Sequence, residues 1–372
     1  MEIVPLLRRL VAVDSTSSLS NVPVLDLLEE AVRPLGFETR RLLWRDERGV
    51  EKGNLVCRRG PDVPGGLALL GHTDCVPFDP EWREALAGEV QDGRIFGRGA
   101  ADTKGFIACA VAAAARTGPM ARPLWLLFTA DEEAGCWGAK KLLEEGRVRP
   151  AFAIDGEPTS LVPVRAHKGY AAVDVEVSGV EGHSSYPDLG ASAIHAASRL
   201  VADVVARVQA DLAQAQDPLF SPPHTTYNVG VIEGGKARNI IAGRCGFTLE
   251  WRPIPGQDPA LGLRLFEEAA ARVEAEGGGR IRVSHTPMRV DDAAVTPAGA
   301  EIVRFLEAES GNAARSAPYG TEMPELTAMG AESCIFGPGD IRVAHRTGEH
   351  VAVAELERCA AILESGVGRF CR

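Results

Sequence analysis

Histidine and carboxylate residues follow short apolar segments of the chain or stand beside glycine-rich turns: His72, Asp74, Asp102, Glu132, Glu133, Glu157 and His345. A structural zinc site favours cysteine and closes all four ligand positions, so imidazoles and carboxylates without a thiolate are poor candidates for one. The same residue types suit divalent ions that take part in catalysis. The set therefore favours a catalytic pair of divalent ions.

One division of this set would place two ions on a shared carboxylate. His72, Asp102 and Glu157 would hold one ion. Glu133 and His345 would hold the other together with Asp102, which then bridges two ions about 3.5–4 Å apart. Three carboxylates offset all but one of the four positive charges, and the remaining charge favours a bound hydroxide.

Neighbouring glutamates are expected to have different tasks. Adjacent side chains on an extended segment point to opposite faces, so Glu132 and Glu133 cannot both bind the same ion without strain. One binds, and the other can take a proton from water and deliver it to a leaving amine. Asp74 can accept the second ring N–H of a liganded His72 and fix its tautomer.

Each of these residues also has an ordinary structural interpretation. His72 alone is more often a turn histidine than a ligand. Glu132 and Glu133 alone suit a solvated helix start, where acidic side chains interact favourably with the helix dipole. The segment Gly97–Arg98–Gly99 lacks the third glycine of a dinucleotide-binding motif, and the sequence has no nucleophile elbow or phosphate-binding loop. The combination favours metal binding over these ordinary interpretations, because four separate segments each carry a residue of metal-binding type.

Four short apolar segments are expected to be strands that lead into polar turns: residues 67–70, 124–129, 151–154 and 333–336. Sites in open α/β sheets form beyond the carboxyl ends of the strands, so these turns should converge. Residues 23–37 predict a helix that ends near Gly36.

Composition excludes several classes of protein. The chain has 372 residues, 45% of them apolar, and a formal net charge of −11. These values are typical of a globular protein of about two domains, and the acidic balance argues against a nucleic-acid groove. The longest apolar run, residues 105–115, is too short for a membrane span and is expected to be a buried helix.

The N-terminal residues lack the features of a signal peptide, so we expect a cytoplasmic protein that does not associate with membranes. The eight cysteines form no CxxC pair. We expect them to be reduced thiols in the core.

The middle of the chain differs from its flanks. Alternating strands are expected at 171–177 and 281–285, and helices at 191–214 and 259–276. This pattern predicts a separate α+β domain of residues 168–288, inserted into a metal-binding catalytic domain of residues 1–167 and 289–372.

Five motifs together resemble the dizinc amidohydrolase and aminoacylase family: Gly71-His72-Thr73-Asp74, residues 99–105 around Asp102, residues 129–133, Gly156-Glu157-Pro158-Thr159 and Gly182-His183-Ser184-Ser185. The resemblance implies an α/β fold, with a zinc-peptidase-like catalytic domain and an inserted α+β lid or dimerisation domain. It also implies a cis peptide bond after Asp102 and a homodimer formed through the inserted domain.

The resemblance assigns roles to the candidate residues. The metal ligands would be His72, Asp102, Glu133, Glu157 and His345. Glu132 would be the general base and Asp74 a second catalytic carboxylate. The implied cofactor is two divalent ions per subunit, zinc in the first place, with cobalt or manganese as alternatives. His350 is a rival to His345, which has the spacing of the family.

Substrate contacts follow from the same resemblance. The counterpart of His183 reaches the neighbouring subunit's site and polarises the substrate carbonyl. Asn239 and Arg252 correspond to contacts of the substrate carboxylate, for which a guanidinium fork is suited. Glu322 would pair with a cationic side-chain amine. A turn histidine, a surface salt bridge and a solvated loop carboxylate are the ordinary alternatives for His183, Arg252 and Glu322.

The implied activity is hydrolysis of a small-molecule N-acyl amino acid. Residues 156–161, 164–169, 252–256 and 319–322 look most like the branch of the family that converts N2-acetyl-L-ornithine to L-ornithine and acetate, a step of arginine biosynthesis. Alternatives within the family are a succinyl-diaminopimelate desuccinylase, an N-acetylcitrulline deacetylase, and a dipeptidase or carboxypeptidase. A metal-binding protein without turnover is disfavoured, because such a protein would not need Glu132.

Overall fold

A computed structural model describes residues 2–372, with all their side chains except that of Val208. The chain divides into two compact units. Unit 1 consists of Met1–Arg165, Thr296–Arg315 and Thr321–Arg372, and unit 2 of Ala166–Val295 and Ser316–Gly320.

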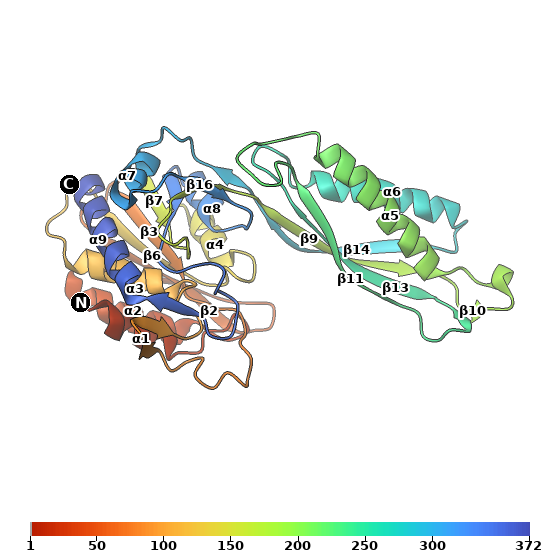
Figure 1. The fold of residues 1–372 in the computed structure, drawn as a ribbon, viewed down its shortest axis with the longest axis horizontal. Coiled ribbons are helices and arrows are strands. Elements are labelled where there is room, and N and C mark those ends of the chain that lie inside the picture. Colours follow the sequence, from red (N-terminus) through yellow and green to blue (C-terminus); the bar gives the residue numbers. More distant parts are fainter. Residues whose placement is uncertain (1) are drawn as a thin grey trace. The chain divides into compact units, whose positions relative to one another are not determined.

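A mixed β-sheet forms the centre of unit 1 (Figure 1). Its strands follow one another in the order β1 (Glu38–Arg45), β2 (Glu51–Arg59), β6 (Leu124–Thr129), β3 (Leu67–His72), β7 (Phe152–Asp155) and β17 (Glu332–Ile335). The sheet continues into β8 (Val164–His167), which pairs with β15 (Ala294–Val295) and β16 (Arg315–Ala317) and along which the chain passes to unit 2.

Four neighbouring strands of this sheet are parallel. β3 pairs in parallel with both β6 and β7, and β17 pairs in parallel with β7. Their carboxyl ends therefore lie along one edge. These are the four strands expected from the sequence, and they are confirmed with small shifts at their ends.

Helices cover both faces of the unit 1 sheet. One core contains Leu67 and Leu69 of β3 with side chains from α1 (Ile3–Val11), α2 (Val22–Val32), α3 (Lys104–Ala115), α7 (Glu301–Ser310) and α9 (Val353–Phe370). The other contains Ala68 and Leu70 with side chains from α4 (Trp137–Glu145) and α8 (Met323–Ala328). Burial on both faces explains why the parallel strands appear as continuous apolar runs in the sequence.

The expected helices of unit 1 are present. α2 ends at Val32, before the expected residue 37, and a 3₁₀ turn, Arg33–Leu35, leads to Gly36 with φ of 81°. The apolar run 105–115 is the buried helix α3. Within residues 2–372, no helix is both long and apolar enough to cross a bilayer. A small sheet joins β4 (Glu89–Gln91), β5 (Arg94–Phe96) and β18 (His350–Ala352).

All eight cysteines are free thiols, and all are buried, as expected. Burial raises the pKa of Cys75 to about 11. This thiol therefore stays protonated near neutral pH.

Unit 2 contains an antiparallel sheet with two helices. The strand order is β11 (Thr226–Gly234), β13 (Arg244–Arg252), β9 (Tyr170–Ser178) and β14 (Arg282–Asp291). α5 (Ala193–Leu212) and α6 (Leu261–Glu276) share a core with alternate residues of β9 and β13 (Figure 1). The short strands β10 (Gly182–His183) and β12 (Ile240–Ile241) pair separately, and η2 (Pro187–Leu189) is a single 3₁₀ turn.

The strands and helices expected between residues 171 and 285 are confirmed, although β14 runs six residues further, to Asp291. Together the two units confirm an α/β fold with an α+β insertion. The function of unit 2 as a lid or dimerisation domain stays a prediction.

Candidate metal centre

The carboxyl ends of the parallel strands supply most of the candidate ligands. His72 is the last residue of β3, Glu133 follows β6, and Glu157 follows β7. Asp102 has a different origin, because it precedes helix α3. The peptide bond between Asp102 and Thr103 is cis, as the family resemblance implies.

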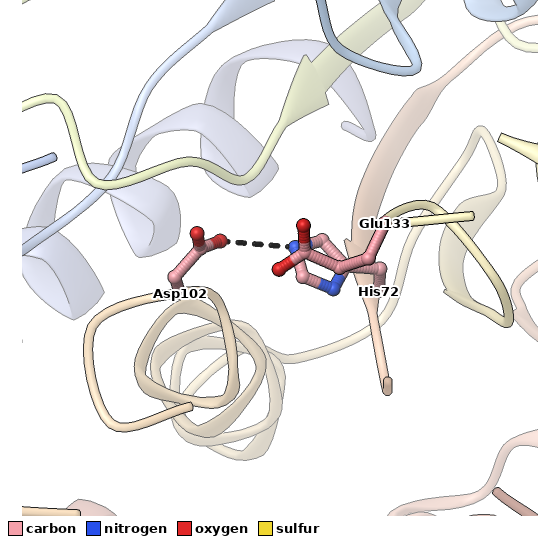
Figure 2. A group of neighbouring side chains, drawn as sticks. All are labelled: His72, Asp102 and Glu133. Carbon is pink, nitrogen blue, oxygen red and sulfur yellow. Dashed lines mark hydrogen bonds and ion pairs between the residues drawn. The ribbon is translucent and has the colours of Figure 1, made fainter. Parts of the chain in front are cut away.

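Asp102 lies between two imidazoles. Nε2 of His72 is 3.0 Å from Oδ1 of Asp102, and Nε2 of His345 is 3.2 Å from its Oδ2. Each oxygen of this one carboxylate thus faces a different histidine. Figure 2 shows the group of His72, Asp102 and Glu133, whose potential ligand atoms all lie within 4.8 Å of one another.

Two further carboxylates complete the cluster. Oε1 of Glu133 is 3.0 Å from Nε2 of His345, on the Oδ2 side of Asp102. Oε1 of Glu157 is 4.0 Å from Nε2 of His72, on the Oδ1 side. The five residues that the sequence groups as ligands therefore lie together, in two sets that share Asp102.

Charge crowding is visible in the pKa shifts of this cluster. Burial, together with the nearby carboxylate of Asp102, raises the pKa of Glu157 well above its usual value. Burial also raises the pKa of Glu133. Hydrogen bonds to Asp102 and Glu133 raise the pKa of His345 to about 10. Buried carboxylates this close together need positive charge to stay ionised.

The donor set fits divalent ions. It offers imidazole nitrogens and carboxylate oxygens, which zinc, cobalt and manganese all accept. Although burial opposes it, hydrogen bonds from His345 and His72 lower the pKa of Asp102 below its usual range, so this carboxylate is ionised. His72, Asp102, Glu133, Glu157 and His345 could hold such ions.

Asp74 and Glu132 lie beside the cluster. The backbone N–H of Glu132 donates to Oδ1 of Asp74 at 3.2 Å, and the thiol of Cys136 donates to Oε1 of Glu132 at 3.6 Å. Nδ1 of His72 is 3.0 Å from the main-chain oxygen of Asp74 and 3.7 Å from its Oδ1. The main-chain oxygen is thus the nearer partner of the imidazole, where the sequence suggested the side chain.

Glu322 is buried in unit 1. It precedes α8, only 1% of its surface is exposed, and its Oε2 accepts a hydrogen bond from Oγ1 of Thr129 at 2.7 Å. Burial, with the nearby carboxylates of Asp155 and Glu132, raises its pKa well above the usual value. Burial also raises the pKa of Asp155 to about 6. Glu322 therefore lies near the cluster, and its contact with a substrate amine stays a prediction.

The remaining candidate contacts belong to unit 2. His183 is exposed, and its Nδ1 accepts from the backbone N–H of Ser185 at 3.1 Å. The guanidinium of Arg252 lies 4.2 Å from the centre of the Tyr170 ring. The exposed Asn239 accepts a backbone hydrogen bond from Ser184 through its main-chain oxygen. Their roles in substrate binding stay predictions.

His345 and His350 have different surroundings. His345 contacts Asp102 and Glu133, and its φ of 59° lies in the left-handed region that non-glycine residues seldom adopt. His350 contacts the carbonyl of Gly348 and the Phe96 ring, whose centre is 4.9 Å from its own. The structure thus brings His345 to the cluster.

Sequence reasoning missed several charged residues that hold this site. Oε1 of the buried Glu349 accepts from the backbone N–H groups of Ala101 and Asp102, at 3.0 and 3.1 Å. Its Oε2 accepts from Arg98 at 2.6 Å. Lys52 is equally buried and pairs with Asp131. Strand β2 reads Glu-Lys-Gly-Asn-Leu-Val-Cys-Arg-Arg, so Lys52 is one of several polar residues in it, and no local signal in the sequence singles it out.

Comparison with known proteins shows similarity to a family and to a fold. The model of peptidase family M20/M25/M40 matches residues 68–368. An acetylornithine deacetylase from Myxococcus xanthus is 50% identical over 370 residues, covering 98% of this chain and 96% of that protein. Another, from Proteus mirabilis, is 34% identical over 97% of this chain and 93% of its own length.

Among solved structures, a metallo-carboxypeptidase of the M20 family from Sulfolobus solfataricus has the same fold. Its TM-score is 0.79 at 16% sequence identity, covering 99% of this chain and 98% of that chain.

Proposed function

The chain belongs to peptidase family M20/M25/M40, and from this premise we propose that it hydrolyses N2-acetyl-L-ornithine to L-ornithine and acetate. The full-length similarity to acetylornithine deacetylases supports this substrate over other N-acyl amino acids. The family resemblance seen in the sequence is thereby confirmed, and the enzyme is a metallohydrolase.

The observation that carries the proposal is the position of Asp102. Its two carboxylate oxygens face His72 and His345 separately, at 3.0 and 3.2 Å. A single carboxylate with a different imidazole on each oxygen is the arrangement expected of a ligand shared by two ions. Each of the two ligand sets has one further carboxylate, Glu157 beside His72 and Glu133 beside His345.

Divalent ions bound here would polarise the amide carbonyl and lower the pKa of a water molecule. The residues of the chain supply the remaining chemistry. Glu132 takes a proton from the attacking water through a carboxylate oxygen. It returns that proton to the amine nitrogen when the C–N bond of the amide breaks. The oxygen and the second proton of the water remain on the acyl carbon as acetic acid, which passes that proton to the released amine. The products are then acetate and the ammonium form of ornithine, so atoms and charge balance.

Asp74 orients this base. Its Oδ1 accepts the backbone N–H of Glu132, and its main-chain oxygen faces Nδ1 of His72. Asp74 thus couples the orientation of the base to that of a ligand histidine.

The proposal includes four residues that would contact the substrate. Arg252 and Asn239 would bind the α-carboxylate of the substrate, and a guanidinium can do so with two hydrogen bonds. Glu322 would pair with the side-chain amine of ornithine. His183 would stabilise the oxyanion that forms at the acyl carbon.

The proposal further includes zinc as the native metal, with cobalt or manganese as alternatives, a cytoplasmic location, and a homodimer formed by unit 2. Exposed apolar side chains on the edge strand β11 support the dimer, since Val231 and Ile232 are 55% and 51% exposed. Metal analysis of the purified protein tests the first point, and light scattering of wild type against Ile232→Lys tests the last.

The primary test is amine release from N2-acetyl-L-ornithine by protein reconstituted with Zn²⁺ or Co²⁺. A chelator-treated sample is the control. We expect turnover that chelation abolishes and that metal restores. Parallel assays use N-succinyl-diaminopimelate, N-acetyl-L-citrulline and a dipeptide.

A higher kcat/KM for one of those three substrates would replace N2-acetyl-L-ornithine and keep the reaction class. A protein shown to hold two ions and inactive on all four substrates would overturn the assignment.

A further inference from the structure

The loop between β6 and α4 carries Glu132 and Glu133, and strand β2 holds it in place through two buried side chains. Asn54 and Lys52 are two residues apart, so they share one face of β2. Oδ1 of Asn54 accepts from the backbone of Ala130, and its Nδ2 donates to the carbonyl of Gly138, at 3.1 and 2.8 Å. Asn54 thereby fixes both ends of the loop.

Lys52 acts at the centre of the loop. Its ammonium donates to Oδ1 of Asp131 at 2.7 Å and to the carbonyl of Ser17 at 2.8 Å. The side chains of Lys52 and Asp131 are only 1% and 5% exposed. A fully desolvated ammonium is costly unless it is paired, so this pair constrains both partners closely.

Asp131 itself has an unusual backbone conformation. Its φ is 56°, in the left-handed region, and it immediately precedes Glu132. Such a conformation costs free energy and persists where the surroundings hold it. The carboxylate bound by Lys52 is one such restraint.

The contacts of Lys52 form a closed ring with the proposed base. The hydroxyl of Ser17 donates to Oδ2 of Asp74 at 2.7 Å, and the backbone N–H of Glu132 donates to Oδ1 of the same carboxylate. The ring runs from Lys52 through Asp131, Glu132, Asp74 and Ser17 back to Lys52. Each member restrains the next, and none except Glu132 and Asp74 has been given a part in the reaction.

We propose that Lys52 is a positioning residue, which holds the turn at Asp131 so that Glu132 and Glu133 point to their separate tasks. Lys52 acts on the reaction through Asp131 and Ser17. This inference rests on the proposed function for its kinetic readout and has a second readout that does not require turnover.

The kinetic test compares Lys52→Met, Asp131→Asn and the double variant with wild type, using whichever acyl amino acid the wild type hydrolyses best and saturating metal. We expect Lys52→Met to lower kcat at least tenfold and to leave KM within twofold. Because the two residues act as a pair, the double variant should be no worse than the poorer single variant.

The matched control is Arg41→Met. Arg41 also forms close ion pairs in unit 1, with Asp26 and Glu29 at 2.7 and 2.6 Å, on the neighbouring strand β1. We expect this variant to lower the Tm and leave kcat unchanged. Asp131→Asn keeps the size of the side chain and carries the test if Lys52→Met does not fold.

A kcat within twofold of wild type for folded Lys52→Met, or multiplicative losses in the double variant, would overturn the proposal and leave Lys52 a purely structural residue.

The second readout is the affinity of the metal-free protein for Co²⁺, followed by its visible absorption. The same turn carries Glu133, so we expect Lys52→Met to bind Co²⁺ at least threefold more weakly, while Arg41→Met binds it as wild type does. If the wild type hydrolyses no acyl amino acid, the proposed function fails and this titration alone decides. Unchanged Co²⁺ affinity in Lys52→Met would then overturn the positioning role.

Discussion

Strand β3 of unit 1 and strand β13 of unit 2 bury their side chains in different patterns. Every residue of β3, Leu67–His72, is buried, whereas buried and more exposed residues alternate along β13, Arg244–Arg252. Helical side chains pack on both faces of the unit 1 sheet, and α5 and α6 pack against alternate residues of the unit 2 sheet. The parallel strand has no exposed position along its length, so its functional groups stand at its carboxyl end, with His72 as the last residue, or in the turn that follows.

The candidate residues differ accordingly. Most of those of unit 1, such as His72 and Asp102, are buried and held by several polar partners, although the side chain of His345 is 50% exposed. In unit 2, His183 and Asn239 are exposed. Electrostatic interactions are stronger where water is excluded. We therefore expect substitutions at the buried site to have the larger effects on catalysis.

The largest effect is expected for Glu132→Gln, because the amide cannot accept a proton from water. General acid–base catalysis contributes about 10²–10⁴-fold, so kcat should fall by about 10³-fold. Metal content should be unchanged, as measured by elemental analysis. A variant that keeps a tenth of the wild-type kcat would remove Glu132 from the role of base.

The variant His183→Ala tests whether unit 2 contributes to catalysis. Loss of one donor to an oxyanion costs about 10²–10³-fold, and we expect kcat to fall by about 10²-fold with metal content unaltered. His195, another exposed histidine of unit 2, provides the matched control, and His195→Ala should retain full activity. Equal rates for the two variants would confine the chemistry to unit 1.

Stability measurements can sharpen the contrast between the strands. In β3, both Leu69→Ala and Leu70→Ala should lower the free energy of unfolding by about 2–5 kcal/mol, since the two side chains pack in different cores. In β13, Leu249→Ala should do the same, while the neighbouring Thr248→Ala should cost less than about 1 kcal/mol. Urea denaturation of the four variants measures this. Similar costs at Leu249 and Thr248 would contradict one-sided burial in unit 2.

The smallest expected effect is on the pH dependence of the stability of unit 1, through the carboxyl group of Glu29. Hydrogen bonds from the Thr39 hydroxyl and from Arg41 and Arg33 lower the pKa of Glu29 to about 2, against the opposing effect of burial. A carboxyl whose pKa is depressed by folding stabilises the protein above its unfolded pKa, and this contribution is lost as the pH falls from about 4.5 through 2.

The excess stability of wild type over Glu29→Gln should thus shrink across that pH range, as followed by denaturation midpoints. For the exposed Asp258 of unit 2, whose pKa Arg264 lowers, Asp258→Asn should give a smaller change over the same range. A difference between wild type and Glu29→Gln that does not vary with pH would refute the contribution of this carboxylate.

Local patterns in the sequence were sufficient to predict the helices and strands and to suggest most residues of the candidate metal cluster. The apolar run that became β3 and the polar turn after it predict both the strand and the position of His72 at its end. The alternation within β13 likewise reflects its one packed face. The two strands could be predicted because the spacing of apolar residues along the chain directly reflects which side chains are buried.

Contacts between distant segments could not be predicted in this way. Lys52 and Asp131 are 79 residues apart, and Glu349 lies 247 residues from the Asp102 backbone that it binds. Nothing in the residues around Lys52 or Glu349 indicates these partners, because the pairing of strands and the packing of loops bring them together. The residues that hold the ligands were missed for this reason.

The amino-acid sequence alone thus indicated which side chains could bind metal and located the strands that carry most of them to within two residues, since residue type and periodicity are local properties. The folded arrangement of unit 1 then set which oxygen of Asp102 faces His72 and which faces His345, and it paired the buried Lys52 with Asp131, the residue before Glu132. These outcomes depend on distances between segments far apart in the chain, and such distances arise only when a common core brings the segments together.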